Sequence, residues 1–247
     1  MFKFFKKAPR GRTVDLSALR IDMHSHLITG IDDGAKTVED SIALVQGLQE
    51  LGYSKLVTTP HIMSEIYPNT NEIIATGLER LKNDVASHIK NLQITAAAEY
   101  FLDDFFDEKL RQDQALLTIS ENLVLVEFSF VSTPLNVNDK FFQMQVKGYQ
   151  PVLAHPERYL YFARNRTQFD ELKSQGCLFQ VNLLSLAGYY GKLSLDLAQY
   201  LVNKGYVDLL GTDMHHLRHL DTLRNSGFIM DTVDKLMDSG KIRNPEL

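Results

Sequence analysis

The stretch Ile21-Asp22-Met23-His24-Ser25-His26 decides how the rest of the chain is interpreted. Its apolar residues alternate with polar ones, which is the pattern of a half-buried strand. On an extended segment, residues two apart point to the same side, so both imidazoles can bind one metal ion. A His-x-His pair alone is a weak sign, because most such pairs are surface or core histidines. The prediction therefore depends on which residues stand at the ends of the other strands.

The same arrangement, an apolar strand and then a residue with a metal-ligand side chain, recurs along the chain. Strand-like and helix-like segments alternate, which is typical of an α/β fold with parallel strands. The first predicted strand ends at His24, and the others cover residues 55–59, 92–98, 123–126, 151–154, 177–181 and 207–210. Seven such units commonly close into a (β/α)7 TIM-like barrel with its active site at the C-terminal strand ends. An open doubly wound sheet is the alternative, but it gathers functional residues at one switch point.

Capping signals mark several of the predicted helix ends. Thr37 followed by Asp40 is close to a capping box, and Thr167 followed by Asp170 resembles one. Ser194 is predicted to cap a helix that Gly205 ends.

Composition and charge narrow the class of protein. The 247 residues are 44% hydrophobic and 23% charged, as in an ordinary globular protein, and we expect residues 19–247 to form one catalytic domain after an N-terminal extension of residues 1–18. A net charge of −5 argues against nucleic acid as a partner. No apolar run approaches the roughly 18 residues that cross a bilayer. The single cysteine, Cys177, excludes an intrachain disulfide and fits a reducing cytoplasm.

The start of the chain, Met1-Phe2-Lys3-Phe4-Phe5-Lys6-Lys7, is basic and aromatic. It lacks the apolar core of a signal peptide. It offers peripheral contact with an anionic membrane surface, and a frayed or packed terminus is the simpler alternative.

Six of the seven predicted strands end in residues with metal-ligand side chains, and one more lies in the first loop. The set is His24, His26, Asp33, His61, Glu99, Glu127, His155, Asp213 and His215. Four carboxylates at one mouth would repel each other unless cations neutralise them. Mixed imidazole and carboxylate ligands suit Mn, Zn or Fe better than Mg or Ca, and nine ligands suit two or three ions. A positive site with a metal-activated nucleophile predicts phosphoester hydrolysis.

Arg158 is the nearest basic residue to this set, and a guanidinium matches a phosphate in a bidentate fork. A salt bridge to Glu157 or to a loop acid is the alternative for this side chain. Asp32 is interpreted first as a turn residue, and Tyr100 as a packing residue. His88, on a helix face, is expected to be structural, and His216 and His219 are expected at the surface.

Other phosphatase and nucleotide-binding motifs are missing from the sequence. A cysteine-dependent tyrosine phosphatase needs Cys-x5-Arg, but Leu183 stands where Cys177 would require the arginine. Neither a P-loop, nor Gly-x-Ser-x-Gly, nor Gly-x-Gly-x-x-Gly occurs.

Seven ordered motifs together resemble the polymerase and histidinol phosphatase (PHP) superfamily. They are Asp22-Met23-His24-Ser25-His26, Asp32-Asp33-Gly34, Thr59-Pro60-His61, Ala98-Glu99-Tyr100, Glu127-Phe128-Ser129, Ala154-His155-Pro156-Glu157-Arg158-Tyr159 and Thr212-Asp213-Met214-His215. Within the superfamily, the chain is most similar to the bacterial manganese-dependent tyrosine-protein phosphatases of capsule and exopolysaccharide operons. The resemblance runs from about Arg20 to the C-terminal helix.

The resemblance implies a distorted seven-stranded barrel with a trinuclear manganese site. One ion would be held by His24, His26, Glu99 and Asp213, a second by Glu99, Glu127 and His155, and a third by Asp33, His61 and His215. His155 and Arg158 would be the catalytic residues, with Arg158 near the phosphate. Many relatives carry basic residues or additional histidines after the residue matching His61, whereas residues 62–70 of this chain include none.

The function implied is hydrolysis of phosphotyrosine in the tail of a membrane-associated tyrosine autokinase that regulates polysaccharide export. A small-molecule phosphomonoesterase of the histidinol-phosphatase type is one alternative, in which the chemistry is kept and the substrate changes. A metal-binding regulatory module without turnover is the other.

Overall fold

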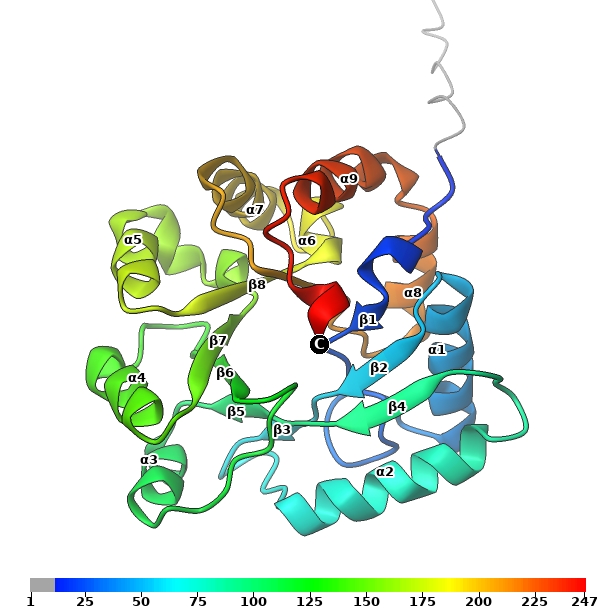
Figure 1. The fold of residues 1–247 in the computed structure, drawn as a ribbon, viewed down its shortest axis with the longest axis horizontal. Helices are drawn as coiled ribbons and strands as arrows, with labels where there is room; N and C mark the ends of the chain where they lie inside the picture. The colour runs from blue at the N-terminus through cyan, green and yellow to red at the C-terminus, as the bar shows by residue number, and fades with distance from the viewer. Residues whose placement is uncertain (1–11) are drawn as a thin grey trace, which may run out of the picture.

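The computed structural model describes residues 12–247, so the predicted membrane contact of residues 1–7 lies outside the described part of the chain. Strands and helices alternate around a ring, with the helices on its outside (Figure 1). The strands are β1 (Ile21–Asp22), β2 (Lys55–Thr58), β3 (His61–Ile62), β4 (Gln93–Ala96), β5 (Glu99–Phe101), β6 (Leu123–Glu127), β7 (Gln150–Ala154), β8 (Leu178–Asn182) and β9 (Leu209–Gly211). The α-helices are α1 (Val38–Glu50), α2 (Asn71–Val85), α3 (Asp104–Arg111), α4 (Val137–Val146), α5 (Thr167–Ser174), α6 (Leu183–Leu186), α7 (Lys192–Lys204), α8 (Leu217–Arg224) and α9 (Met230–Asp238).

The strands form two parallel sheets, ordered β1-β2-β4 and β3-β5-β6-β7-β8-β9. The predicted α/β fold with parallel strands is therefore confirmed. Two predicted strands, 55–59 and 92–98, are each followed by a second short strand, because the chain leaves the first sheet after β2 and after β4 and enters the second at β3 and at β5. Pro60 lies at the first break and has no N–H to donate to a ladder. Its carbonyl still accepts from Glu99 N at 3.1 Å, so the two segments stay side by side across the break.

No continuous ladder closes the ring between β1 and β9 in the described residues. The gap is bridged by one parallel pair, Ser25 with Met214. At the opposite end, the buried Asn244 side chain donates to Ile21 O at 3.0 Å and to Leu210 O at 2.7 Å. Figure 1 accordingly places the C-terminus beside β1. The ring is thus not closed by strand pairing, as expected of the distorted (β/α)7 barrel, and the Asn244 side chain links β1 to β9 where β1 is only two residues long.

The predicted capping signals have mixed outcomes. The capping box is confirmed: Asp40 N donates to Thr37 Oγ1, and Thr37 N donates to Asp40 Oδ2, both at 3.2 Å. Gly205 ends α7 in the left-handed region, at φ +66°. The two other caps are wrong, because Thr167 is already the first residue of α5 and Ser194 lies buried inside α7.

Side chains alternate between the two faces of the strands, and this alternation places the polar site. In β6, the side chains of Leu123 and Leu125 belong to an inner apolar cluster, whereas Val124 and Val126 pack in the outer core under the helices. Glu127, two residues after Leu125, continues the inner row at the C-terminal end of the strand. The ring interior is therefore apolar at one end and carries carboxylates and imidazoles at the other. No helix among residues 12–247 is both long and apolar enough to span a membrane.

Candidate metal centre

All nine side chains proposed as ligands come together at the C-terminal strand ends. Donor atoms within 4.8 Å of one another form four overlapping groups: His24, His26 and Asp213; His24, Glu99 and His155; His61, Glu99 and Glu127; and His26, Asp33, His61 and His215. The innermost side chains are fully buried, and Asp33, with a side chain 51% exposed, is at the rim.

The spacing of the donor atoms matches ligands that share ions. His24 Nε2 and His155 Nε2 each lie 3.1 Å from a Glu99 oxygen, and His61 Nδ1 lies 3.3 Å from Glu99 Oε2. His155 Nε2 is 3.7 Å from Glu127 Oε1. Two ligand atoms that each lie about 2.1 Å from one ion are about 3.0–3.4 Å apart in octahedral or tetrahedral geometry. Glu99 contacts donors of several groups, as a bridging carboxylate would.

The grouping differs from the set implied by the resemblance, and Glu99 is not part of the group that joins His24, His26 and Asp213. Glu99 shares one group with His24 and His155 and another with His61 and Glu127, so no single group joins Glu99, Glu127 and His155.

The two histidines of the opening motif are oriented by partners behind them. His24 Nδ1 lies 2.7 Å from Gln180 Oε1, and His26 Nδ1 lies 2.7 Å from Asp32 Oδ2. If Nδ1 carries the proton in both rings, each Nε2 keeps a lone pair directed at the cluster, which is the arrangement of metal-ligating histidines. Asp32, interpreted as a turn residue, therefore also positions a ligand, and Gln180 was not predicted at all.

A chain of hydrogen bonds along β8 connects opposite sides of the centre. Gln180 Nε2 donates to Asn182 Oδ1 at 2.7 Å, and Asn182 Nδ2 donates to Asp213 Oδ2 at 2.7 Å. Gly211 leaves room for this chain, since a Cβ there would lie 2.7 Å from Gln180 Nε2. A sequence signal was present: two polar residues alternate with apolar ones in an otherwise buried strand, so both face the ring interior.

The pKa shifts of the clustered side chains are those expected of residues that bind cations. Burial acts to raise the pKa of Glu99, but the facing imidazoles, His24 foremost, hold that pKa well below its usual range. Burial, and then the charge of Glu99, raises the pKa of Glu127 well above its usual range. Burial and the charge of Arg158 lower the pKa of His155 to about 4, so its imidazole is neutral at pH 7, as a ligand must be. Of these two neighbouring carboxylates, Glu99 favours the charged form and Glu127 the neutral form. Bound divalent cations would stabilise the charged form of both.

Two of the proposed ligands have unusual backbone conformations. His155 has φ +33° and Asp213 has φ +50°, both in the left-handed region that residues with a Cβ rarely adopt. Each comes directly after a strand or its extension, where the turn directs the side chain back over the strand end. Strain of about 1–3 kcal/mol per such residue is typical of functional sites.

Arg158 lies at the mouth of the centre but does not pair with Glu157. Its guanidinium donates to Asp213 Oδ2 at 2.8 Å and lies between the rings of Tyr190 and Phe130, 4.3 and 4.8 Å from their centroids. The alternative salt bridge to Glu157 is therefore wrong, whereas the alternative salt bridge to a loop acid is confirmed, because Asp213 lies in the loop after β9. Glu157 is fully buried and instead accepts from the backbone N of Asn182 and the hydroxyl of Ser185.

The pocket above the centre has a volume of about 220 Å³, and Arg158 is its only arginine or lysine among the described residues. His216 and His219 also line it. His216 is exposed as expected, but His219 is 7% exposed, so its predicted surface position is wrong. It packs edge-on against the Tyr189 ring, with centroids 5.0 Å apart.

Two tyrosines lie near the proposed ligands. In the loop 62–70, which has no basic residues, Tyr67 stacks on His61 with centroids 5.5 Å apart. Tyr100 is buried and its hydroxyl accepts from Leu117 N, as expected of a packing residue.

The fold and the site together define an α/β protein with a His/Asp/Glu cluster able to hold metal ions at the C-terminal ends of parallel strands. The sequence profile of the family described as "Capsular polysaccharide synthesis, CpsB/CapC" matches residues 20–226. The chain belongs to this family, which confirms the resemblance inferred from the motifs.

Named relatives and a solved structure agree with this membership. The chain is 27% identical over 198 residues to the tyrosine-protein phosphatase YwqE of Bacillus subtilis, covering 80% of this chain and 78% of the relative. It is 29% identical over 204 residues to the tyrosine-protein phosphatase CpsB of Streptococcus pneumoniae, covering 80% and 83%. A crystal structure from a study of YwqE and CpsB, described there as unique metal-dependent tyrosine phosphatases, superposes with a TM-score of 0.78 at 26% identity, covering 87% of this chain and 86% of the other.

Proposed function

We propose that this chain is a metal-dependent protein-tyrosine phosphatase, which hydrolyses phosphotyrosine on a tyrosine kinase of capsule or exopolysaccharide production. The observation that carries the proposal is the largely buried cluster of nine imidazole and carboxylate side chains with Arg158 at its mouth. The relatives named as tyrosine-protein phosphatases supply the substrate class.

The nine clustered residues are proposed as ligands of two or three divalent ions, with manganese as the expected metal and iron or zinc as alternatives. The donor spacing, the neutral His155 and the histidines fixed by Gln180 and Asp32 all support this assignment. Bound ions would supply an activated water nucleophile and would neutralise phosphate oxygens.

Arg158 is the proposed phosphate-binding residue. Its salt bridge to Asp213 and its position between two rings fix the guanidinium while part of it faces the pocket. A fixed cation stabilises charge on the phosphate without reorganising during the reaction. The tyrosine phenol has a pKa near 10, so it leaves without much assistance from an acid.

The partner and the place of action are inferred from the proposed substrate. The tail of a membrane-associated kinase is the proposed partner, and the cytoplasm is the proposed location. Residues 19–247 are proposed as the catalytic domain, and residues 1–7 as a site of peripheral membrane contact.

The proposal is tested by steady-state hydrolysis of a phosphotyrosyl peptide and of histidinol phosphate, side by side. The enzyme is stripped with chelator and reloaded with Mn, Zn or Fe. We expect peptide turnover that is restored by metal and abolished in His155→Ala. A preference for histidinol phosphate would move the function to metabolism, and no turnover of either substrate with metal bound would contradict both assignments.

A further inference from the structure

The pocket mouth carries an aromatic side chain that the proposed chemistry does not use. Phe130 lies in the loop after β6 and is 48% exposed. Its ring stacks on the His155 imidazole, with centroids 5.8 Å apart and planes at 18°, and the Arg158 guanidinium lies 4.8 Å from its centroid. Phe130 and Arg158 both line the pocket, so a group bound at Arg158 lies near this ring.

The backbone before Phe130 is held in place from both sides. Phe128 N donates to the Tyr159 hydroxyl at 2.9 Å, and the Tyr161 hydroxyl donates to Ser129 O at 3.1 Å. The Phe128 ring is fully buried and packs on Tyr159, with centroids 5.4 Å apart. The position of Phe130 is thus set by an anchored segment, and a preorganised group binds a ligand at a lower entropic cost.

Core packing explains why position 128 is a phenylalanine, but it does not explain the phenylalanine at position 130. The two residues have the same side chain and are two positions apart, yet one is fully buried and the other remains half exposed at the pocket. An exposed aromatic ring that contacts a candidate ligand and the Arg158 guanidinium has the character of a recognition surface.

We propose that Phe130 determines specificity by stacking on the aromatic ring of the substrate, so that aryl phosphates are preferred over alkyl phosphates of equal size. This inference rests on the proposed phosphatase function and adds a residue that discriminates between substrates. A phosphate held between Arg158 and the cluster carries its ester group outward, past the Phe130 ring. One aromatic pair at this position corresponds to a preference of about three- to tenfold.

The test is binding of two phosphonates that differ in aromaticity and hardly in size, benzylphosphonate and cyclohexylmethylphosphonate. Dissociation constants are measured by calorimetry on the metal-loaded full chain, so the result does not depend on turnover. We expect the native chain to bind benzylphosphonate about three- to tenfold more tightly. In Phe130→Leu the two constants should agree to within about twofold, and Phe130→Tyr, which keeps a ring, should restore the preference.

Phe142→Leu is the matched control, because it makes the same change at a phenylalanine that is 66% exposed on α4 and does not line the pocket. It should keep the native ratio. The metal content of all variants is measured to verify that the centre is intact. Equal affinities in the native chain, a native ratio in Phe130→Leu, or no binding of either phosphonate would each overturn the inference.

Hydrolysis of a phosphotyrosyl peptide by the same preparations separates this inference from the proposed function. A native chain that hydrolyses the peptide while Phe130→Leu keeps the binding ratio would remove the role of Phe130 alone. A native chain without turnover but with a Phe130-dependent binding preference would instead remove the phosphatase proposal and leave the role of Phe130.

Discussion

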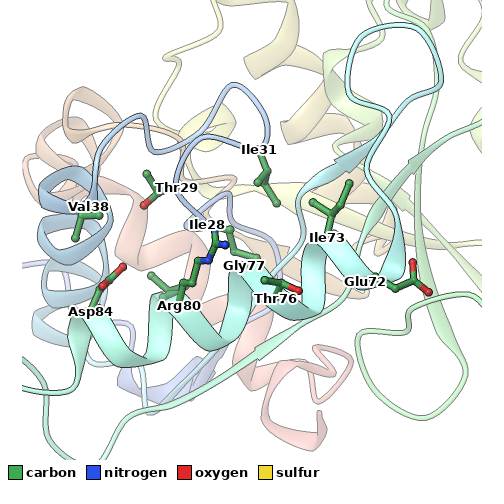
Figure 2. Close-up of a pocket in the computed structure, with 11 residues that line it drawn as sticks. Ile28, Thr29, Ile31, Val38, Glu72, Ile73, Thr76, Gly77, Arg80 and Asp84 are labelled. Carbon is green, nitrogen blue, oxygen red and sulfur yellow. The ribbon is translucent and has the colours of Figure 1, made fainter.

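Two hollows of the molecule are separated by one loop, and the smaller one is the proposed active site. The larger, of about 470 Å³, lies between α2 and the segment around residues 28–38. In Figure 2 its wall carries Ile28, Gly77 and Arg80 near the middle and Ile73 towards one end. The smaller, of about 220 Å³, lies over the metal centre. Volume alone would select the wrong one.

The two hollows differ because different parts of the secondary-structure elements line them. The larger hollow is lined by the side of a helix, where apolar residues alternate with solvated charges such as Glu72 and Asp84. The smaller is lined by strand ends, where backbone geometry directs side chains to a common point. The loop from 27 to 36 serves both: Ile31 lines the larger hollow, and Asp33 lines the metal pocket. Convergence of donor atoms, and not empty volume, is the ground on which we propose the smaller hollow as the active site.

The most severe test of this comparison is Glu99→Gln in the metal pocket. Gln has the same shape but lacks the charge that faces four imidazoles. We expect loss of bound metal and a fall in phosphatase activity of at least about a thousandfold, since direct ligands matter more than the 10- to 100-fold typical of groups behind them. Elemental analysis and kcat/KM are the measurements. Normal metal content and activity would refute the assignment of Glu99 as a bridging ligand.

Arg158→Lys should have the next largest effect. Lysine keeps the positive charge but loses the planar fork that contacts Asp213 Oδ2 and lies between two rings. We expect kcat/KM to fall by about 10²- to 10³-fold, the usual loss for one group that stabilises charge in the transition state. Metal content should be unchanged. Equal loss of metal and activity would show that Arg158 supports the centre and does not bind phosphate.

Gln180→Leu should have a smaller effect, because Gln180 acts through His24 and Asn182 and does not face the pocket. The change removes the acceptor for His24 Nδ1 and leaves the Asn182 side chain without its donor. We expect metal affinity to weaken about 10- to 100-fold. Activity should return at saturating metal, so titration of activity against Mn concentration separates weaker binding from damaged chemistry. Activity that stays low at saturating metal would contradict a purely positioning role.

Ile73→Ser in the larger hollow should have the smallest effect. Ile73 is 42% exposed, so its replacement removes less buried apolar surface than the loss of a core isoleucine would. We expect kcat/KM and metal content to stay within about twofold of the native values, and stability to change by no more than about 1 kcal/mol. Thermal unfolding and steady-state kinetics are the measurements. A large loss of activity would mean that the two hollows are coupled through the loop between them.

Residues with local signals could be predicted from the sequence, and residues that act through distant partners could not. His24 and His26 share a side of one extended segment, and Glu127 continues the inner row of its strand, so strand periodicity was sufficient for both. Gln180 escaped prediction because its role depends on His24, 156 residues earlier in the chain. His219 escaped because α8 was not predicted, and burial of a polar residue on a short helix depends on what packs against it.

The sequence by itself determined the alternation of strands and helices, the parallel sheets and the ends at which ligands gather. These features result from periodicity and from the rule that parallel strands need crossovers. Only the tertiary structure decided the link between β1 and β9 through Asn244 and the pairing of Arg158 with Asp213. Each of these depends on hydrogen bonds or ion pairs between residues far apart in the chain, and such contacts leave no periodic pattern because their geometry exists only once the elements have packed.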